Sequence, residues 1–126
     1  MVGALSGPIP NWTYKNNIVS VNAGPAIINA GFPGCADDTI NNTAKLVACF
    51  SPFAMNDNVL IGGSGPWPIG NYLPASAAAV QFVNYNNANG GDYRLLSTSP
   101  YHNAGSDGKD LGADVAAVNS HISGVQ

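Results

Sequence analysis

The sequence predicts an all-β domain made of short strands, and three observations lead to this prediction. Strand-like runs of three to five residues recur, each bounded by Asn, Gly or Pro. No window carries the apolar periodicity of a long amphipathic helix. Two segments, 14–20 and 54–62, share an Asn followed by aliphatic residues, with Asn17 and Asn58 lying 41 positions apart. A solenoid of stacked repeats and an antiparallel β-sandwich both fit these observations.

The expected strands are spread along the chain. They cover residues 17–21, 26–28, 46–50, 58–61, 80–83 and 93–96. An Asn at the start of a short strand tolerates the left-handed backbone region, and in a stack its side chain can bond the Asn of the next layer. Single helical turns are expected at 75–79 and 113–118, where Asp114 suits the positive end of a helix dipole.

Length and composition exclude several classes of protein. The 126 residues are enough for one domain, residues 1–126, and too few for two of ordinary size. Only 9% of the residues are charged, and the seven acids are all Asp and face four bases. Four scattered cations cannot neutralise a row of phosphates, so we expect no nucleic-acid partner. A hydrophobic fraction of 45% with a net charge of −3 argues against disorder.

The termini and the cysteines bear on location. No apolar run approaches the roughly 20 residues of a membrane span, so no membrane partner is expected. The first eight residues lack a basic stretch and an apolar core, and we expect no signal peptide in this chain. Cys35 and Cys49 are a disulfide candidate, which would stabilise the fold by roughly 3 kcal/mol. Two buried free thiols are the alternative.

The last third of the chain carries a resemblance. The run Asp92-Tyr93-Arg94-Leu95-Leu96 continues through Ser99-Pro100 and Ala104-Gly105 to Asp110-Leu111-Gly112-Ala113-Asp114. It resembles the closing segment of right-handed parallel β-helix proteins of the pectate-lyase-like group. Upstream, Asn71-Tyr72-Leu73-Pro74 and residues 80–84 resemble the segment that leads to this ending. The resemblance extends over residues 54–118. It implies a solenoid fragment, with coils and long loops over about 1–91 and a C-terminal cap over 92–126.

Within this resemblance, residues 92–126 are expected to close the stack. Proline and glycine provide the corners, and Asp side chains accept bonds from nearby backbone N–H groups. The expected cap residues are Pro100, Gly105, Asp107, Gly108, Asp110, Gly112 and Asp114. An ordered cap is physically required where a stack of strands ends.

The resemblance implies a secreted or cell-surface protein associated with polysaccharide. The family implies a polysaccharide lyase or a glycoside hydrolase, but we expect no catalytic residue in this chain. Hydrolysis needs two carboxyls roughly 5–10 Å apart. Adjacent Asp37 and Asp38 would point to opposite faces of a strand, and Asp57 fits a turn better. The expected role is therefore structural, and Arg94 is expected to pair with a nearby Asp.

Metal binding and sugar binding complete the expectations about sites. No cofactor is expected. His102 and His121 have no partner at a spacing suited to zinc. The weak candidates for calcium ligands are Asp107, Asp110 and Asp114. Flat aromatic rings could instead stack on sugar rings, and these carbohydrate-binding candidates are Trp12, Tyr14, Trp67 and Tyr72. The alternative is that these rings cover the core.

Two kinds of protein partner are expected. An uncapped N-terminal coil would leave open strand edges, so we expect a homo-oligomer or association with missing N-terminal coils. A third reading is an adhesin or fibre scaffold, in which the loops 31–44 and 62–74 contact a partner.

Overall fold

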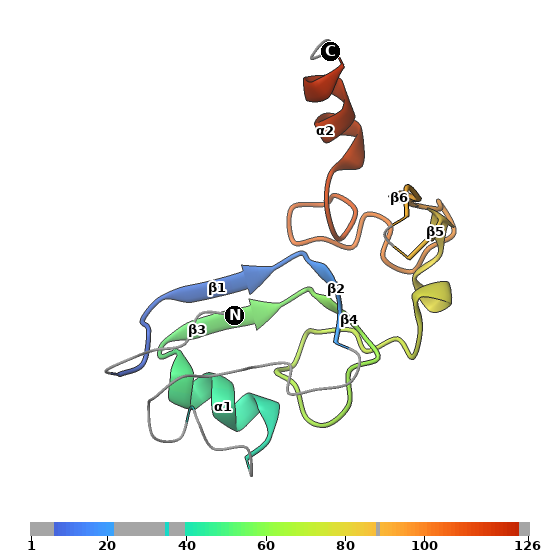
Figure 1. Ribbon diagram of the computed structural model, residues 1–126. Coiled ribbons are helices and arrows are strands. Elements are labelled where there is room, and N and C mark those ends of the chain that lie inside the picture. The colour runs from blue at the N-terminus through green and yellow to red at the C-terminus, as the bar shows by residue number, and fades with distance from the viewer. Residues whose placement is uncertain (1–6, 22–34, 36–39, 88, 124–126) are drawn as a thin grey trace.

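The computed structural model describes residues 7–21, 35, 40–87 and 89–123. The described elements follow the chain as β1 (Trp12–Lys15), β2 (Ile18–Ser20), α1 (Asn42–Cys49), β3 (Phe53–Asn56), β4 (Val59–Ile61), a 3₁₀ helix (Ala77–Val80), β5 (Phe82–Asn84), β6 (Asp92–Leu95) and α2 (Val115–Ile122). Figure 1 shows β1 beside β3 over α1, with β5, β6 and α2 at the other end of the molecule.

The structure overturns the predicted fold class. The described residues form a small mixed α/β domain with two α-helices and three separate two-stranded sheets. It is neither a right-handed parallel β-helix nor any other solenoid, and the antiparallel sandwich is wrong as well. Two of the sheets are parallel and only one is antiparallel. The physical reason is that two segments form capped helices, 42–49 and 115–122, while left-handed corners at Asn16 and Asp57 end the β1–β3 ladder after four residues.

Helix α1 replaces the strand expected at 46–50. The side chain of Asn41 accepts a hydrogen bond from the N–H of Ala44 at 2.9 Å, so it caps the N-terminus of the helix. Leu46 and Cys49 lie three positions apart on one face and are both buried. A short apolar run does not by itself distinguish a buried strand from a buried helix. Here the Asn41 cap stabilises the helix.

The parallel pairs have the offset that the two similar segments indicate. Trp12 lies opposite Phe53 in β1 and β3, and Ile18 lies opposite Val59 in β2 and β4. The side-chain amide of Asn17 donates to Oδ1 of Asn58 at 3.0 Å. This contact between matching Asn residues is confirmed, although the solenoid that suggested it is wrong.

The other expected strands and helical turns agree only in part with the structure. The strands at 17–21, 58–61 and 93–96 correspond to β2, β4 and β6, while 80–83 is divided between the 3₁₀ helix and β5. The sequence analysis missed β1 and β3. The strand expected at 26–28 lies outside the described residues. The helical turn expected at 113–118 overlaps α2 at 115–118, and Asp114 caps this helix by accepting from the N–H of Ala117.

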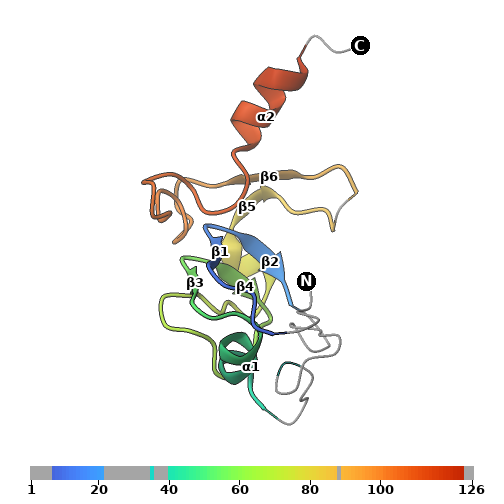
Figure 2. The same ribbon diagram turned by 90° about the vertical axis from the view of Figure 1, so that its left-hand side faces the viewer.

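The core consists of two clusters. One joins α1 to β3 and β4 and is built around Leu46, Phe50 and Leu60. The other lies under the C-terminal segment and contains Val80 and Leu111. Figure 2 shows α2 standing away from both, and this helix buries none of its residues. No helix within the described residues is long and apolar enough to cross a membrane.

Candidate functional site

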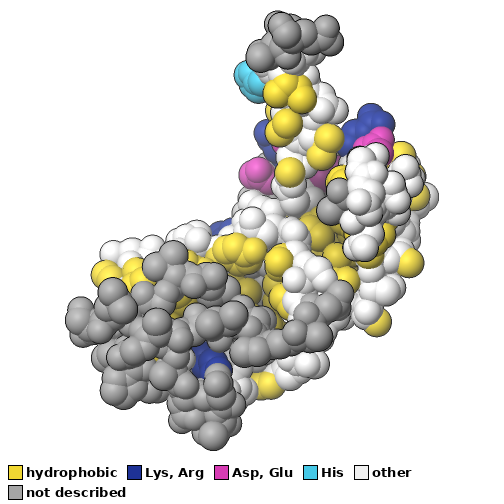
Figure 3. Space-filling model, in the orientation of Figure 1, with side chains coloured by type: hydrophobic (Ala, Val, Ile, Leu, Met, Phe, Trp, Pro, Cys, Tyr) yellow, Lys and Arg dark blue, Asp and Glu magenta, His cyan; other side chains and the backbone are white. Residues whose placement is uncertain are grey.

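A cavity in the described part of the chain lies at the foot of α2. It has a volume of about 590 Å³, within the range of small-molecule sites. Strand β6 forms one wall, and the loop that leads into α2 forms the other. Figure 3 shows acidic and basic side chains gathered around the foot of this helix. The C-terminal third of the chain therefore forms most of a cavity that has charged side chains around it.

Apolar side chains form part of the lining of this cavity. Leu95 from β6 and Leu111 from the loop are buried and line it, together with Val115 at the start of α2. Tyr93 also lines the cavity, and its ring and that of Phe82 meet edge to face at a centroid distance of 5.7 Å. The site thus combines a fixed apolar surface with an aromatic ring.

His102 and Asp110 form a pair in the wall of the cavity. Nδ1 of His102 donates to Oδ1 of Asp110 at 2.6 Å, and the backbone N–H of Asn103 donates to the same oxygen at 2.9 Å. Both side chains are about a third exposed, at 36% and 37%. With Nδ1 as the donor, Nε2 of a neutral His102 is an acceptor.

The charged groups around the cavity are mostly paired. Lys109 lies 3.5 Å from Asp114, and the guanidinium of Arg94 pairs with Asp92, as the sequence analysis expected. The N–H of Ala117, followed by Lys109, lowers the pKa of Asp114 below its usual range. Hydrogen bonds from Arg94 lower the pKa of Asp92. Both carboxyl groups therefore stay ionised at neutral pH.

The loop between β6 and α2 is held by its own backbone. The N–H of Gly105 donates to the carbonyl of Lys109 at 2.8 Å, and Asp107 accepts from the N–H of Lys109. Gly108 and Gly112 adopt positive φ angles of 77° and 95°. These bonds, with the left-handed glycines, fix the two ends of the loop and bring His102 next to Asp110.

The same loop is attached to the corner between β1 and β2. The N–H of Gly112 donates to the carbonyl of Asn16 at 2.9 Å, and the N–H of Ser106 donates to Oδ1 of Asn16 at 3.0 Å. Upstream, Ser99 precedes Pro100 and is buried, and its hydroxyl donates to the carbonyl of Val80. The residues expected to form a cap thus belong to an ordered loop, although there is no solenoid for it to close.

Three of the four aromatic candidates for sugar binding lie together. Trp12 and Tyr14 stack with parallel rings 5.6 Å apart, and Trp12 also stacks on buried Phe50. Trp67 packs against the same core cluster. Burial raises the pKa of Tyr14. These rings are half-buried, and none of them lines the cavity.

Tyr72 is separate from the other aromatic candidates. It is 39% exposed, and its ring packs edge to face with that of Tyr101 at a centroid distance of 5.3 Å. A carbohydrate site formed by all four rings is therefore not assembled in this structure.

The calcium candidates are used within the fold. Asp107 and Asp114 accept backbone N–H groups, and Asp110 holds His102 and Asn103. Among the described residues, no group of three or more His, Cys, Asp or Glu side chains is placed to hold a metal ion. Asp37 and Asp38 lie outside the described residues, and Asp57 occupies a left-handed turn position between β3 and β4.

The sequence alone does not indicate His102 as a site residue. This histidine was considered only as a zinc ligand, and Asp110 was expected to be a cap residue. The available signal was the spacing, because Gly105 and Gly108 between them permit the tight turns that bring positions 102 and 110 together. Tyr93 was missed because a strand residue gives no indication of which loop will cover it.

Comparison of the chain with protein-family models, with curated proteins and with solved structures finds no match. The site must therefore be interpreted from its own geometry.

Proposed function

We propose that the chain is a non-catalytic module that binds a neutral carbohydrate in the cavity at the foot of α2. The observation that carries the proposal is the composition of this one cavity. Tyr93 and Val115, both partly exposed, offer aromatic and apolar surface for the C–H face of a sugar ring, with buried Leu95 and Leu111 behind them. Nε2 of His102 and the exposed part of the Asp110 carboxylate offer hydrogen-bond acceptors for hydroxyl groups.

The charges in the cavity favour a neutral ligand over an acidic one. Its lining contains two bases, Arg94 and Lys109, and three acids, Asp107, Asp110 and Asp114. Both bases already pair with carboxylates. A uronate would therefore meet a slight excess of negative charge, which opposes its binding. The polysaccharide associated with this chain is accordingly proposed to be uncharged.

The carboxyl groups support binding without catalysis. A glycoside hydrolase needs a general acid whose pKa is raised. Asp114 in the cavity and Asp92 beside it have lowered pKa values instead. Neither carboxyl can hold a proton at neutral pH for delivery to a leaving group.

The test is an NMR titration of the full chain with uncharged hexasaccharides of glucose, mannose and galactose, and with oligogalacturonate. We expect saturable shifts of residues 93–95 and 102–114 with a neutral glycan and none with the uronate. His102→Ala should raise the Kd about tenfold, the effect of one lost hydrogen bond to a ligand. The matched control is His121→Ala, because exposed His121 lies outside the cavity lining.

Two results would overturn the proposal. The first is the absence of saturable shifts with every neutral glycan. The second is a change in tryptophan fluorescence with no shift in the cavity, because the cavity contains no tryptophan. That second result would assign the sugar to the cluster of Trp12 and Trp67.

A further inference from the structure

The loop between β5 and β6 contains the one Asn in the sequence that a glycine follows. Asn89 precedes Gly90, and both residues are exposed. Figure 2 shows this loop projecting from the edge of the molecule. The backbone nitrogen of the residue after an Asn is held near the side-chain amide carbon, and a glycine, which has no Cβ, hinders an attack on that carbon least. The pair is therefore chemically suited to an intramolecular reaction.

The surroundings of Gly90 leave its backbone nitrogen accessible. Among the described residues, no group accepts a hydrogen bond from the N–H of Gly90. A Cβ built on Gly90 would meet no atom within 4 Å, and its φ is 77°. The described part of the chain thus neither holds this nitrogen nor covers it, and the backbone has room to rotate toward the side chain of Asn89.

The side chain of Asn89 is held only by a weak contact. Its Nδ2 donates to the carbonyl of Asn87 at 3.1 Å, and both residues are exposed. An exposed bond of this kind costs little to break, because water replaces it. The backbone is held more firmly, since the N–H of Asn89 donates to the carbonyl of Asn86 at 2.8 Å. The amide carbon of Asn89 can therefore turn toward Gly90 while the loop keeps its shape.

A comparable pair in the loop before α2 is restrained at both of its reacting groups. Asp107 precedes Gly108, and the N–H of Gly108 donates to the carbonyl of Gly105 at 2.9 Å. The carboxylate of Asp107 accepts from the N–H of Lys109 at 3.2 Å. Attack by the nitrogen of Gly108 would break both bonds. The fold therefore restrains the pair 107–108 and leaves the pair 89–90 free to react.

We propose that Asn89 is a site of spontaneous deamidation, at which the folded chain converts this side chain to Asp or isoaspartate. The backbone nitrogen of Gly90 loses its proton and bonds to Cγ of Asn89, and Nδ2 leaves as ammonia, which gives a cyclic succinimide. Water then opens the ring. Hydrolysis at Cγ gives Asp, and hydrolysis at the backbone carbonyl carbon gives isoaspartate, whose main chain runs through Cβ and Cγ. Water is the co-reactant, and no atom is oxidised or reduced. Neither residue lines the cavity at the foot of α2, so the site is independent of the proposed glycan binding.

The conversion changes the charge and the backbone of the loop. Both products add one negative charge to the formal net charge of −3 and remove the donor to the carbonyl of Asn87. Isoaspartate also lengthens the main chain next to Gly91, where space is tight, because a Cβ on Gly91 would lie 2.5 Å from the carbonyl oxygen of Asn84. We therefore expect isoaspartate to loosen the pairing of Asn84 with Asp92 at the end of the β5–β6 sheet.

The test is incubation of the purified full chain at neutral pH, followed by peptide mass spectrometry at successive times. We expect the peptide that contains Asn89 to gain the mass difference between NH₂ and OH, and electron-transfer fragmentation to detect both Asp and isoaspartate. Asn89→Gln should abolish the gain, because its longer side chain would have to close a larger ring. Gly90→Ala should slow the conversion about tenfold, because its Cβ hinders the attack.

A second variant tests whether the fold selects the site. Asp107→Asn places the same Asn-Gly pair in the loop before α2, where its Oδ1 can still accept from Lys109. In the folded chain we expect position 107 to convert about tenfold more slowly than Asn89, because the N–H of Gly108 is already bonded. In concentrated urea the two positions should convert at similar rates. Circular dichroism checks that the variant is folded in the absence of urea.

Either of two results would overturn the proposal. The first is the absence of a mass gain at Asn89 in the folded chain over a time in which a free peptide of residues 84–94 is fully converted. The second is an equal rate at Asn89 and at position 107 of the folded Asp107→Asn chain, because the hydrogen bonds of the fold would then not select the site.

Discussion

Asn58 holds three separate segments of the chain together. Its side chain is fully buried. Its amide donates to the carbonyl of Tyr14 and to Oδ1 of Asn71, and its Oδ1 accepts from the backbone N–H and the side chain of Asn17. A buried amide with these partners loses nothing by leaving water, whereas each of the partners depends on it.

Asn58→Ala should therefore destabilise the fold strongly. The substitution leaves the carbonyl of Tyr14 and the backbone N–H of Asn17 without their buried partner. Each unsatisfied group costs about 1–3 kcal/mol, so we expect a loss of about 3 kcal/mol in the free energy of unfolding. Urea denaturation measures it. Asn119→Ala, on the exposed surface of α2, is the control and should change stability by less than about 0.5 kcal/mol. Equal effects of the two substitutions would contradict this role.

Asp114 makes the start of α2 sensitive to acid. Its folded-state pKa is lowered, first by the N–H of Ala117 and then by Lys109. The stabilisation is therefore present above the unfolded-state pKa of about 3.9, and it is lost as the pH falls through the folded-state value. We expect the amide of Ala117 to lose its hydrogen-bonded NMR shift as the pH falls below about 4.

A matched variant isolates this titration. Asp114→Asn keeps an oxygen that can accept from Ala117 but cannot be protonated in this range, so its amide shift should stay constant. If Asp114→Asn shows the same acid transition, the group that titrates is a different one.

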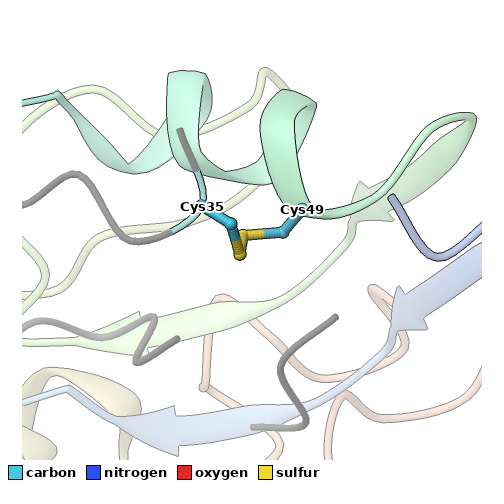
Figure 4. The surroundings of a disulfide bond; sticks show 2 residues. All are labelled: Cys35 and Cys49. Carbon is cyan, nitrogen blue, oxygen red and sulfur yellow. A yellow bond between two sulfur atoms is a disulfide. The ribbon is translucent and has the colours of Figure 1, made fainter. Parts of the chain in front are cut away.

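Helix α1 depends on contacts at both of its ends. Asn41 caps its first turn, and a disulfide joins Cys49 in its last turn to Cys35, as Figure 4 shows. Both cysteines are buried, with Cα atoms 4.9 Å apart. An isolated helix of eight residues is unstable in water, so these attachments and the burial of Leu46 keep α1 folded.

Reduction of the disulfide should destabilise α1 and the cluster beneath it. The bridge spans 14 positions, for which the loss of its constraint on the unfolded chain amounts to roughly 3 kcal/mol. We expect a reductant to lower the urea midpoint of the chain by a corresponding amount. The double variant Cys35→Ala and Cys49→Ala should start from the lower midpoint and should not respond to reductant. An unchanged midpoint after verified reduction would show that the bridge does not stabilise this domain.

At the scale of the whole molecule, the two ends of the described chain are stabilised by different contacts. The N-terminal two-thirds packs β1, β3 and α1 around one cluster, and the C-terminal third surrounds the cavity at the foot of α2. Asn16 links them, because the loop before α2 bonds to its carbonyl and its side chain. The proposed glycan site lies at the C-terminal end of this division.

The sequence by itself determined features that depend on neighbouring residues or on a repeated pattern. The Asn17–Asn58 offset, the approximate positions of β2, β4 and β6, and the carboxylate at the start of α2 were all readable from it. These features depend on backbone preferences and short-range hydrogen bonds, which the local sequence contains.

Tertiary structure decided the rest. Most of the run 46–50 lies in a helix because Asn41 caps that helix and because Leu46 and Cys49 are buried in the core. An apolar run alone does not reveal either contact. His102 met Asp110 only because the loop before α2 closes. The fold class itself depended on the formation of α1 and α2 and on strands that pair in separate two-stranded sheets. Such outcomes depend on contacts between residues distant in the sequence, whose energies no local pattern contains.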